Sequence, residues 1–397
     1  MSRIPYTNKV GETIGSIADP AAAYSLRALN GGDPMVARVR RSSDDAEKDF
    51  TASAVSGGAL VDWVNEDIVI TNAAFTNIGG SYDTFSGSSS SGFTATNTAS
   101  DGRALSNLTI STPQVGDKFR INYNLTLNSG SGITFLLATS TGSSASSGVN
   151  VTSSGTGSIE LTANNLDVAT LRVNAIENVD FVLSGLSVTA IQSSGHVTTW
   201  YDQSGNGNNA TQSTASRQPK IVDAGVLVSD GIEFDGAYSH LSSDWGILTG
   251  NAAHSIFGVA KSSATGDRTL VSWGAVGGAS LAGIGQQVNP TAYVQSFSGP
   301  LLVSDAGFTS ERLVSLHHNG TSSVGAAKLF VDGTKNPAAD SPADTPNHTS
   351  TDLFIGTRSN LSSDWQGYIK EIIIYNSDQS ANRAAIETNI NNHYDIY

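Results

Sequence analysis

The stretch VTTWYDQSGNGNNATQ, Val197 to Gln212, decides the fold of the chain around it. Its first five residues, VTTWY, are β-branched or aromatic, which favours a strand. The strand then stops in DQSGNG (202–207), where glycines permit positive φ values and short polar side chains can cap a turn. ATQ (210–212) becomes extended again. The stretch therefore predicts a strand, a tight loop and a second strand.

The composition of the whole chain favours an all-β protein with many turns. The chain has 397 residues, of which 38% are hydrophobic and only 14% are charged, together with 41 glycines. Long runs of serine and threonine suit strands with hydroxylated outer faces rather than a helical enzyme. At this length, two or three domains are expected, and each can bury a core.

The net charge and the residue usage exclude several partner classes. With a net charge of −14 and a pI near 4.7, the chain lacks the clustered lysines and arginines that nucleic acid requires. An anionic membrane surface is disfavoured for the same reason. Cysteine is absent, which excludes disulfides and thiolate zinc sites. No stretch approaches the roughly 20 apolar residues of a membrane helix. Residues 1–19 also lack the apolar core of a secretory signal, so we expect a protein made in the cytoplasm, without membrane insertion.

The two ends of the chain contain the predicted helices. Residues 1–19 show no periodicity and predict an extended N-terminal arm. Asp19-Pro20 has the pattern of a helix start, and AAAYSLRAL after it predicts a helix that stops at glycines 31 and 32. MVARVRR (35–41) alternates apolar and basic residues, as a half-exposed strand does. Short helices are predicted at 57–65 and, with apolar residues on one stripe, at 379–394.

Residues 67–192 differ in composition from the rest of the chain, because serine, threonine, glycine and asparagine dominate there. Short strand patterns recur between Gly/Ser turns, most clearly in KFRINYNLTL (118–127), and predict a second β-sandwich. The run SGSSSSG (86–92) is predicted to be a loop. The order VGDKFRINYNLTLNSG, TGSIELTAN and VDFVLSGLSVTAI resembles the small β-sandwich carbohydrate-binding modules found beside xylanases and in phage proteins. The early aromatic residues of this block are either core residues or sugar contacts: Phe75, Tyr82, Phe85 and Phe93.

The remainder of the chain carries a second resemblance. The segments AYSLRAL, VARVRRSSDDAEKDF, the opening stretch, IEFDG and GYIKEIIIY are similar to the catalytic-domain family of α-L-arabinofuranosidase B, which recurs in bacteriophage structural proteins. The resemblance implies a concanavalin A-like, laminin-G-like sandwich over 20–66 plus 193–397, with 67–192 nested in it. The expected fold class is thus all-β, with two β-sandwich (jelly-roll) domains and few short helices. Insertions of this kind are tolerated at exposed loops where strand ends lie close together.

The hydrolase chemistry of that family is not expected here. A retaining glycosidase needs two carboxyl groups about 5–5.5 Å apart. The family places its nucleophilic glutamate in a Gly-Asn-Ala-Glu turn, and the corresponding segment in this chain, WGAVGG (273–278), contains no acid. The second carboxyl group of the family has no aligned counterpart in this chain, and Asp305 is only near in sequence. The resemblance implies that the fold is kept. The missing glutamate predicts that the protein is not an enzyme and has no catalytic residues.

Two aspartates are candidates for a metal site. Asp202 begins the loop of the opening stretch, and Asp235 lies in the IEFDG turn. Concanavalin A-like folds often bind calcium with such oxygens. The alternative is that each carboxylate caps its own turn. No other cofactor is expected.

A repeated motif supplies the candidate sugar contacts. LSSDW occurs at 241–245 and again at 361–365, so that Asp244 and Trp245, and likewise Asp364 and Trp365, stand side by side. A tryptophan ring can stack on a sugar while the carboxylate accepts its hydroxyl groups. The alternative is a chance repeat or two equivalent structural corners. Tyr201, with Trp200, is a further candidate as a sugar platform. The alternative is that the pair splits, with one ring in the core and the other on a neighbouring loop.

Two classes of function follow. The first is a non-enzymatic bacteriophage protein on the virion surface, such as a fibre, head-decoration or tail-appendage subunit. Its expected partners are other virion proteins, further copies of the chain (a trimer in a fibre) and a host-surface glycan. The alternatives are a glycoside hydrolase acting on arabinose-containing polysaccharide and a free carbohydrate-binding lectin.

Overall fold

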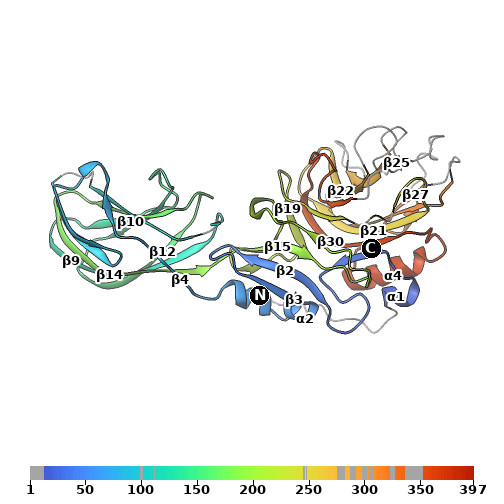
Figure 1. The fold of residues 1–397 in the computed structure, drawn as a ribbon, viewed down its shortest axis with the longest axis horizontal. Helices are drawn as coiled ribbons and strands as arrows, with labels where there is room; N and C mark the ends of the chain where they lie inside the picture. Colours follow the sequence, from blue (N-terminus) through green and yellow to red (C-terminus); the bar gives the residue numbers. More distant parts are fainter. Residues whose placement is uncertain are drawn as a thin grey trace.

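A computed structural model describes residues 13–98, 102–110, 112–244, 246, 248–274, 282–286, 292–296, 302–303, 307–321, 327–335 and 352–397. Strands dominate these residues and the helices are few and short, which confirms the predicted all-β class. The strand pairs that build the sheets are antiparallel. Figure 1 shows two bodies of strands, which we call the inserted unit (left) and the host unit (right).

The host unit contains the strands from both ends of the chain. They are β1 (Ala22–Ser25), β2 (Met35–Arg41), β3 (Glu47–Thr51), β15 (Gly195–Trp200), β16 (Ala210–Thr211), β17 (Lys220–Asp223), β18 (Val226–Leu227), β19 (Ile232–Asp235), β20 (Leu241–Asp244), β21 (His254–Ser262), β22 (Arg268–Trp273), β23 (Ala282–Gln286), β24 (Ala292–Ser296), β25 (Leu302–Val303), β26 (Arg312–His318), β27 (Ala327–Val331), β28 (Thr334–Lys335), β29 (Asp352–Ile355) and β30 (Gln366–Tyr375). Strand β30 pairs with β21 along one edge and with β19 and β1 along the other. Strand β15 pairs with β2, β16 and β17, and the β17–β19 pairing joins the two groups.

The inserted unit has two sheets of its own. One runs β11 (Val149–Val151), β10 (Ile133–Ala138), β13 (Thr170–Ala175), β8 (Arg103–Asn107), β5 (Thr76–Asn77). The other runs β12 (Gly155–Thr162), β9 (Lys118–Ser129), β14 (Val179–Gln192), β7 (Gly92–Asn97), β6 (Thr84–Ser89), with β4 (Ile68–Ile70) on β14. Strand β4 enters the unit beside the end of β14, with Ile68 opposite Ala190. The chain therefore enters and leaves the inserted unit on neighbouring strands.

Each unit has a separate apolar core. Tyr24, Trp200, Trp273 and Trp365 are fully buried in the host core. A different set fills the inserted unit, in which Phe75, Tyr82 and Phe93 are buried and Phe85 packs against the core. Burying a large apolar side chain contributes about 1.5–3 kcal/mol. These aromatic rings are thus part of the cores.

Short helices lie against the host strands (Figure 1). They are α1 (Ile14–Ile17), α2 (Ala52–Ser56), α3 (Ala59–Val64) and α4 (Arg383–Tyr394). One 3-10 turn, Ala215–Arg217, is in the host unit and another, Ile78–Gly80, is in the inserted unit. Helix α4 buries Ile386 and Ile390 in a third apolar cluster against β21 and β30. The predicted helices near 57–65 and 379–394 are therefore present.

Three local predictions are wrong. The residues after Pro20 form strand β1 rather than a helix, since all four of them are buried and pair with Glu371–Ile374 of β30. Pairing and burial outweigh the helix propensity of alanine. Residues 86–89 belong to β6, which forms a hairpin with β7 instead of a loop. Within the predicted extended arm, Ile14–Ile17 form the short helix α1 and Ile14 is buried, while residues 1–12 lie outside the described residues.

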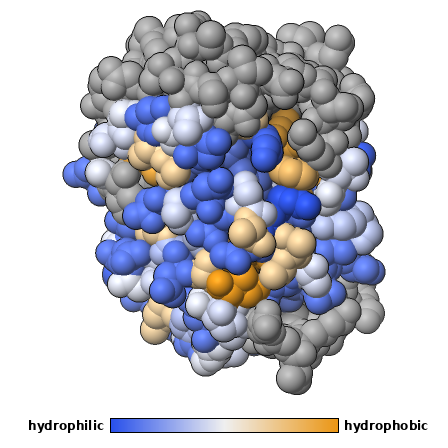
Figure 2. Space-filling model, turned by 90° about the vertical axis from the view of Figure 1, so that its right-hand side faces the viewer, coloured by the Kyte–Doolittle hydropathy of each residue, from blue (hydrophilic) through white to orange (hydrophobic). Residues whose placement is uncertain are grey.

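The surface of the host end is mainly polar. Figure 2 shows hydrophilic residues over most of the described surface in this view, with small groups of apolar residues between them. Small groups of this kind are normal on soluble proteins and need no partner. Among the described residues, no helix is long and apolar enough to cross a membrane.

Candidate functional site

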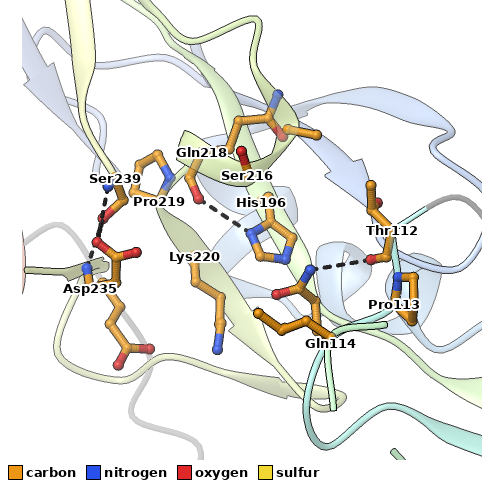
Figure 3. A pocket seen from close by; sticks show the side chains of 13 residues that line it. Thr112, Pro113, Gln114, His196, Ser216, Gln218, Pro219, Lys220, Asp235 and Ser239 are labelled. Atoms are coloured by element: carbon orange, nitrogen blue, oxygen red, sulfur yellow. Dashed lines mark hydrogen bonds between the residues drawn. The ribbon is translucent and has the colours of Figure 1, made fainter. Parts of the chain in front are cut away.

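The best candidate site is a pocket where the two units meet. Its cavity of about 380 Å³ lies within the usual range for small-molecule sites, about 300–1,000 Å³. Host residues form most of its wall, and the inserted unit adds a loop that approaches from the other side (Figure 3). The lining residues are Thr112, Pro113, Gln114, Leu166, His196, Ala215, Ser216, Gln218, Pro219, Lys220, Glu233, Asp235 and Ser239. The site thus depends on both units.

His196 lies in the wall of this pocket with one ring nitrogen unused. The residue is on β15 and is only 5% exposed. Its Nδ1 is 3.4 Å from the carbonyl oxygen of Gln218, whereas its Nε2 is buried and has no hydrogen-bond partner among the described residues. Burial, followed by the charge of Arg40, lowers the pKa of His196 to about 3. The imidazole is therefore neutral at physiological pH, and a buried polar atom of this kind calls for a ligand or a water.

Asp235 presents one free carboxylate oxygen at the same pocket. Its Oδ1 accepts hydrogen bonds from the backbone amides of Ala237, Tyr238 and Ser239 at 2.9–3.0 Å and from the Ser239 hydroxyl at 2.8 Å. Burial raises the pKa of Asp235, but these hydrogen bonds outweigh it and hold the pKa below its ordinary value. Its Oδ2 accepts no hydrogen bond from the described residues. Asp235 is thus ionised, fixed in place and able to accept from a ligand.

Glu233 and Lys220 complete the charged part of the wall. Glu233 is two residues before Asp235 on β19, so the two side chains share one face of the strand. Lys220 of β17 stands opposite Glu233 in the strand register, and its ammonium lies 2.8 Å from Asp223 Oδ1. Burial, helped by Asp223 and Asp235 and opposed by Lys220, raises the pKa of Glu233.

Buried polar side chains hold the loop of the inserted unit against the host. The Arg40 guanidinium donates to Gln218 Oε1 and to Asp45 Oδ1, each at 2.7 Å, and to the hydroxyl of Thr112. This side chain therefore joins the host strand β2 to both sides of the pocket, because Gln218 and Thr112 line it from opposite units.

Asp117 makes the second connection between the units. It follows Gly116, whose φ of +100° suits glycine, and it is only 1% exposed. Its Oδ2 accepts from the Gln114 amide at 2.8 Å and the Ser42 hydroxyl at 2.9 Å, and its Oδ1 accepts from the Ser194 hydroxyl at 3.3 Å. Burial raises the pKa of Asp117 to about 6, although these hydrogen bonds oppose the shift.

The two aspartates proposed for calcium have local partners. Asp202 accepts from the amides of Ala23, Ser204 and Asn208 and from the Ser204 hydroxyl, at 2.7–2.9 Å. No group of three or more metal-binding side chains occurs in the part of the chain that the structure describes. The structure thus places both carboxylates as turn caps, and only Asp235 reaches the pocket.

The LSSDW repeats and Tyr201 do not form one site in the described residues. Trp365 is fully buried and packs edge-on against Phe308, with ring centroids 5.1 Å apart, so no face is free for a sugar. Asp364 accepts a hydrogen bond from Thr357. Asp244 is exposed at the end of β20, while Trp245 lies outside the described residues, as do positions 275–278 and Asp305. Tyr201 is half-buried and donates to Asp49 Oδ1 at 2.6 Å.

Sequence reasoning did not find His196, Glu233, Lys220 or the loop at 112–114. The alternation of IEFD does place Glu233 and Asp235 on one face, and that was the usable signal. A lone histidine on an apolar strand gives no signal of a binding site.

Comparisons with known proteins assign no family. No family model and no curated protein sequence matches the chain. A solved GH54 α-L-arabinofuranosidase soaked with a cyclic sulfate inhibitor is 13% identical, with a TM-score of 0.38 over 70% of this chain and 62% of that chain. A Trypanosoma rangeli sialidase in complex with sialic acid is 11% identical, with a TM-score of 0.36 over 80% of this chain and 53% of that chain.

A smaller module gives a weaker likeness. The CBM40 of a Ruminococcus gnavus sialidase, bound to α2,6 sialyllactose, is 15% identical with a TM-score of 0.27, over 34% of this chain and 83% of that chain. The chain spans about a third of the length of another T. rangeli sialidase, 31%. With every one of these TM-scores below 0.5, the activity of this protein has to be argued from its own residues.

Proposed function

We propose that this protein is a non-enzymatic, lectin-like glycan-binding protein and that the pocket between its two units is the ligand site. The observation that carries the proposal concerns two acceptors in the pocket: among the described residues, the buried Nε2 of His196 and the Oδ2 of Asp235 have no hydrogen-bond partner. Sugar hydroxyl groups are donors that can pair with such acceptors. The cost of an unsatisfied buried polar atom, about 1–3 kcal/mol, is then relieved by ligand binding.

The arrangement of the acids supports binding rather than hydrolysis. A glycosidase places its two carboxyl groups on either side of the bond that it cleaves. Glu233 and Asp235 instead come from one face of a single strand, and therefore lie on the same wall. The opposite wall, from the inserted unit, contributes Thr112, Pro113, Gln114 and Leu166, none of which is an acid.

The wider role that we propose is attachment to a glycan, on the virion surface of a bacteriophage as the sequence resemblance implies. Mass spectrometry of purified particles tests this context, with the chain expected among the structural proteins together with its virion partners. Its absence from particles, with glycan binding retained, would instead favour a free lectin.

Binding itself is tested with the variant His196→Phe on a glycan array and by titration calorimetry. The variant removes the acceptor while keeping a ring of similar size, so we expect binding weaker by about tenfold with no loss of thermal stability. His393→Phe, the same change on α4, is the control and leaves binding unchanged. If no glycan binds, or if H196F binds as tightly as the native protein, the proposal fails. Turnover of an aryl arabinofuranoside that Glu233→Gln abolishes would support the hydrolase instead.

A further inference from the structure

The charges around the pocket are unequal. Glu233 and Asp235 line it, and Lys220 is the one cation among the described lining residues. Because the Lys220 ammonium is ion-paired with Asp223 at 2.8 Å, its charge is already largely balanced. The Arg40 guanidinium nearby is likewise paired with Asp45. Neither Glu233 nor Asp235 forms an ion pair among the described residues, although the charge of Lys220 also acts on Glu233, so negative charge is in excess around the pocket.

These two carboxylates can reach a ligand. Glu233 is half-buried, and its carboxylate accepts no hydrogen bond from the described residues. Asp235 is held by four donors on Oδ1, which leaves Oδ2 for an outside donor. Charges in a partly buried site interact more strongly than on an open surface, because less water screens them. The pocket thus favours a positive group beside its hydroxyl-binding acceptors.

One exposed apolar side chain lines the pocket, and an exposed aromatic ring lies in the turn that holds Asp235. Tyr238, in the turn that holds Asp235, is 67% exposed, and Leu166, which lines the pocket from the inserted unit, is 63% exposed. Exposed rings and aliphatic groups beside polar acceptors suit a sugar, which has both C–H faces and hydroxyl groups.

We infer that the pocket selects a sugar unit that carries a protonated amine and disfavours sugars that carry a carboxylate. The amine lies between Glu233 and Asp235 Oδ2, while ring hydroxyl groups donate to His196 Nε2 and Asp235. This inference rests on the proposed function and names the ligand class of its site. An acidic sugar meets two carboxylates that have no ion-pair partner among the described residues, and is repelled.

Calorimetric titration with matched methyl glycosides tests the selection. The probes are the amino, neutral and uronic acid forms of glucose, galactose and mannose, which differ in charge within each series. We expect the amino form to bind about fivefold more tightly than the neutral form, and the uronic acid to bind more weakly than both. Concentrated salt should reduce the difference, because it screens the charges.

Variants separate the selection from binding as such. Glu233→Gln should lose most of the preference for the amino form over the neutral form. The control Glu177→Gln removes an exposed carboxylate before β14, at the far end of the inserted unit, and should keep the preference. If acidic and neutral sugars bind equally, or if E233Q keeps the full preference, the inference is overturned while the proposed function stands. If none of the sugars binds, the proposed function fails as well.

Discussion

The carboxylate of Asp202 accepts a hydrogen bond from the backbone amide of Ala23 at 2.8 Å, although 179 residues separate the two in sequence. The same side chain accepts three further hydrogen bonds from Ser204 and Asn208. It therefore closes the loop after β15 and fixes strand β1 beside it. The loop in the fold-deciding stretch joins two segments of the host that the inserted unit separates.

Asp202→Ala is expected to lower the free energy of unfolding by about 2–4 kcal/mol, since several partly buried donors lose their acceptor. Urea unfolding measures the change, and Asp267→Asn, at an exposed carboxylate, serves as the control. A melting temperature that calcium raises in the native protein but not in D202A would favour the metal site over the cap.

The buried ion pair behind helix α4 predicts a large effect of one charge. Arg27 Nε and Nη2 lie 2.7 and 2.9 Å from the Glu371 carboxylate oxygens, and both side chains are almost fully buried. Glu371→Gln is expected to cost about 3–5 kcal/mol because it leaves the guanidinium uncompensated. Adding Arg27→Met should recover much of this loss in urea unfolding. A double variant no more stable than E371Q would contradict the explanation.

The same pair gives the protein sensitivity to acid. Burial raises the pKa of Glu371, but the charge and hydrogen bonds of Arg27 outweigh it and lower the pKa below its ordinary value. A depressed folded-state pKa means that the stabilisation is present above the unfolded pKa and is lost as pH falls through the folded pKa. As pH falls, the free energy of unfolding should therefore decrease less in the double variant than in the native protein.

Asp117 predicts the opposite dependence on pH. Burial raises its pKa to about 6, so its contribution is fully present below the unfolded pKa and is lost as pH rises through about 6. Asp117→Asn should raise the free energy of unfolding near neutral pH by about 1–3 kcal/mol and have little effect in acid. Urea unfolding across this pH range checks the sign, and parallel pH profiles for the two proteins would refute it.

Removal of residues 67–192 should leave a host that folds. Its core is separate from that of the inserted unit, and the β4–β14 pairing brings the two ends of the insertion together, so a short flexible linker can replace it. Circular dichroism and cooperative urea unfolding test this expectation. The shortened protein should lose glycan binding, because Thr112 to Gln114 and Leu166 no longer line the pocket. Failure to fold, in a protein whose separate 67–192 fragment folds, would show that the host needs the contacts of Arg40 and Ser42.

Sequence patterns predicted the strands best where alternation is regular. KFRINYNLTL buries every second residue over most of its length in β9, so a period of two was sufficient. The same approach failed for the residues after Pro20, because they form a strand only by pairing with β30, at the other end of the chain. Local propensity contains no information about that pairing.

The pocket could not be predicted from the sequence for the same reason. His196, Glu233 and Thr112 come from separate segments and from both units, and their proximity depends on how the units meet. The sequence singled out the aspartates of the two turns, but the hydrogen bonds that hold their carboxylates depend on the three-dimensional structure. Trp365 gave a misleading signal, since a tryptophan beside an aspartate looks the same whether its ring is exposed or buried.

The neighbouring entry and exit strands of the inserted unit also bear on how the chain acquires its structure. All strand partners within 68–192 are complete before β30 leaves the ribosome, whereas β1 must wait for it. If the inserted unit forms first, it brings the two host segments to within about 5 Å, the spacing of paired strands. The folding of the host then no longer includes the entropic cost of closing so long a loop. Its last strand, β30, completes a nearly formed structure.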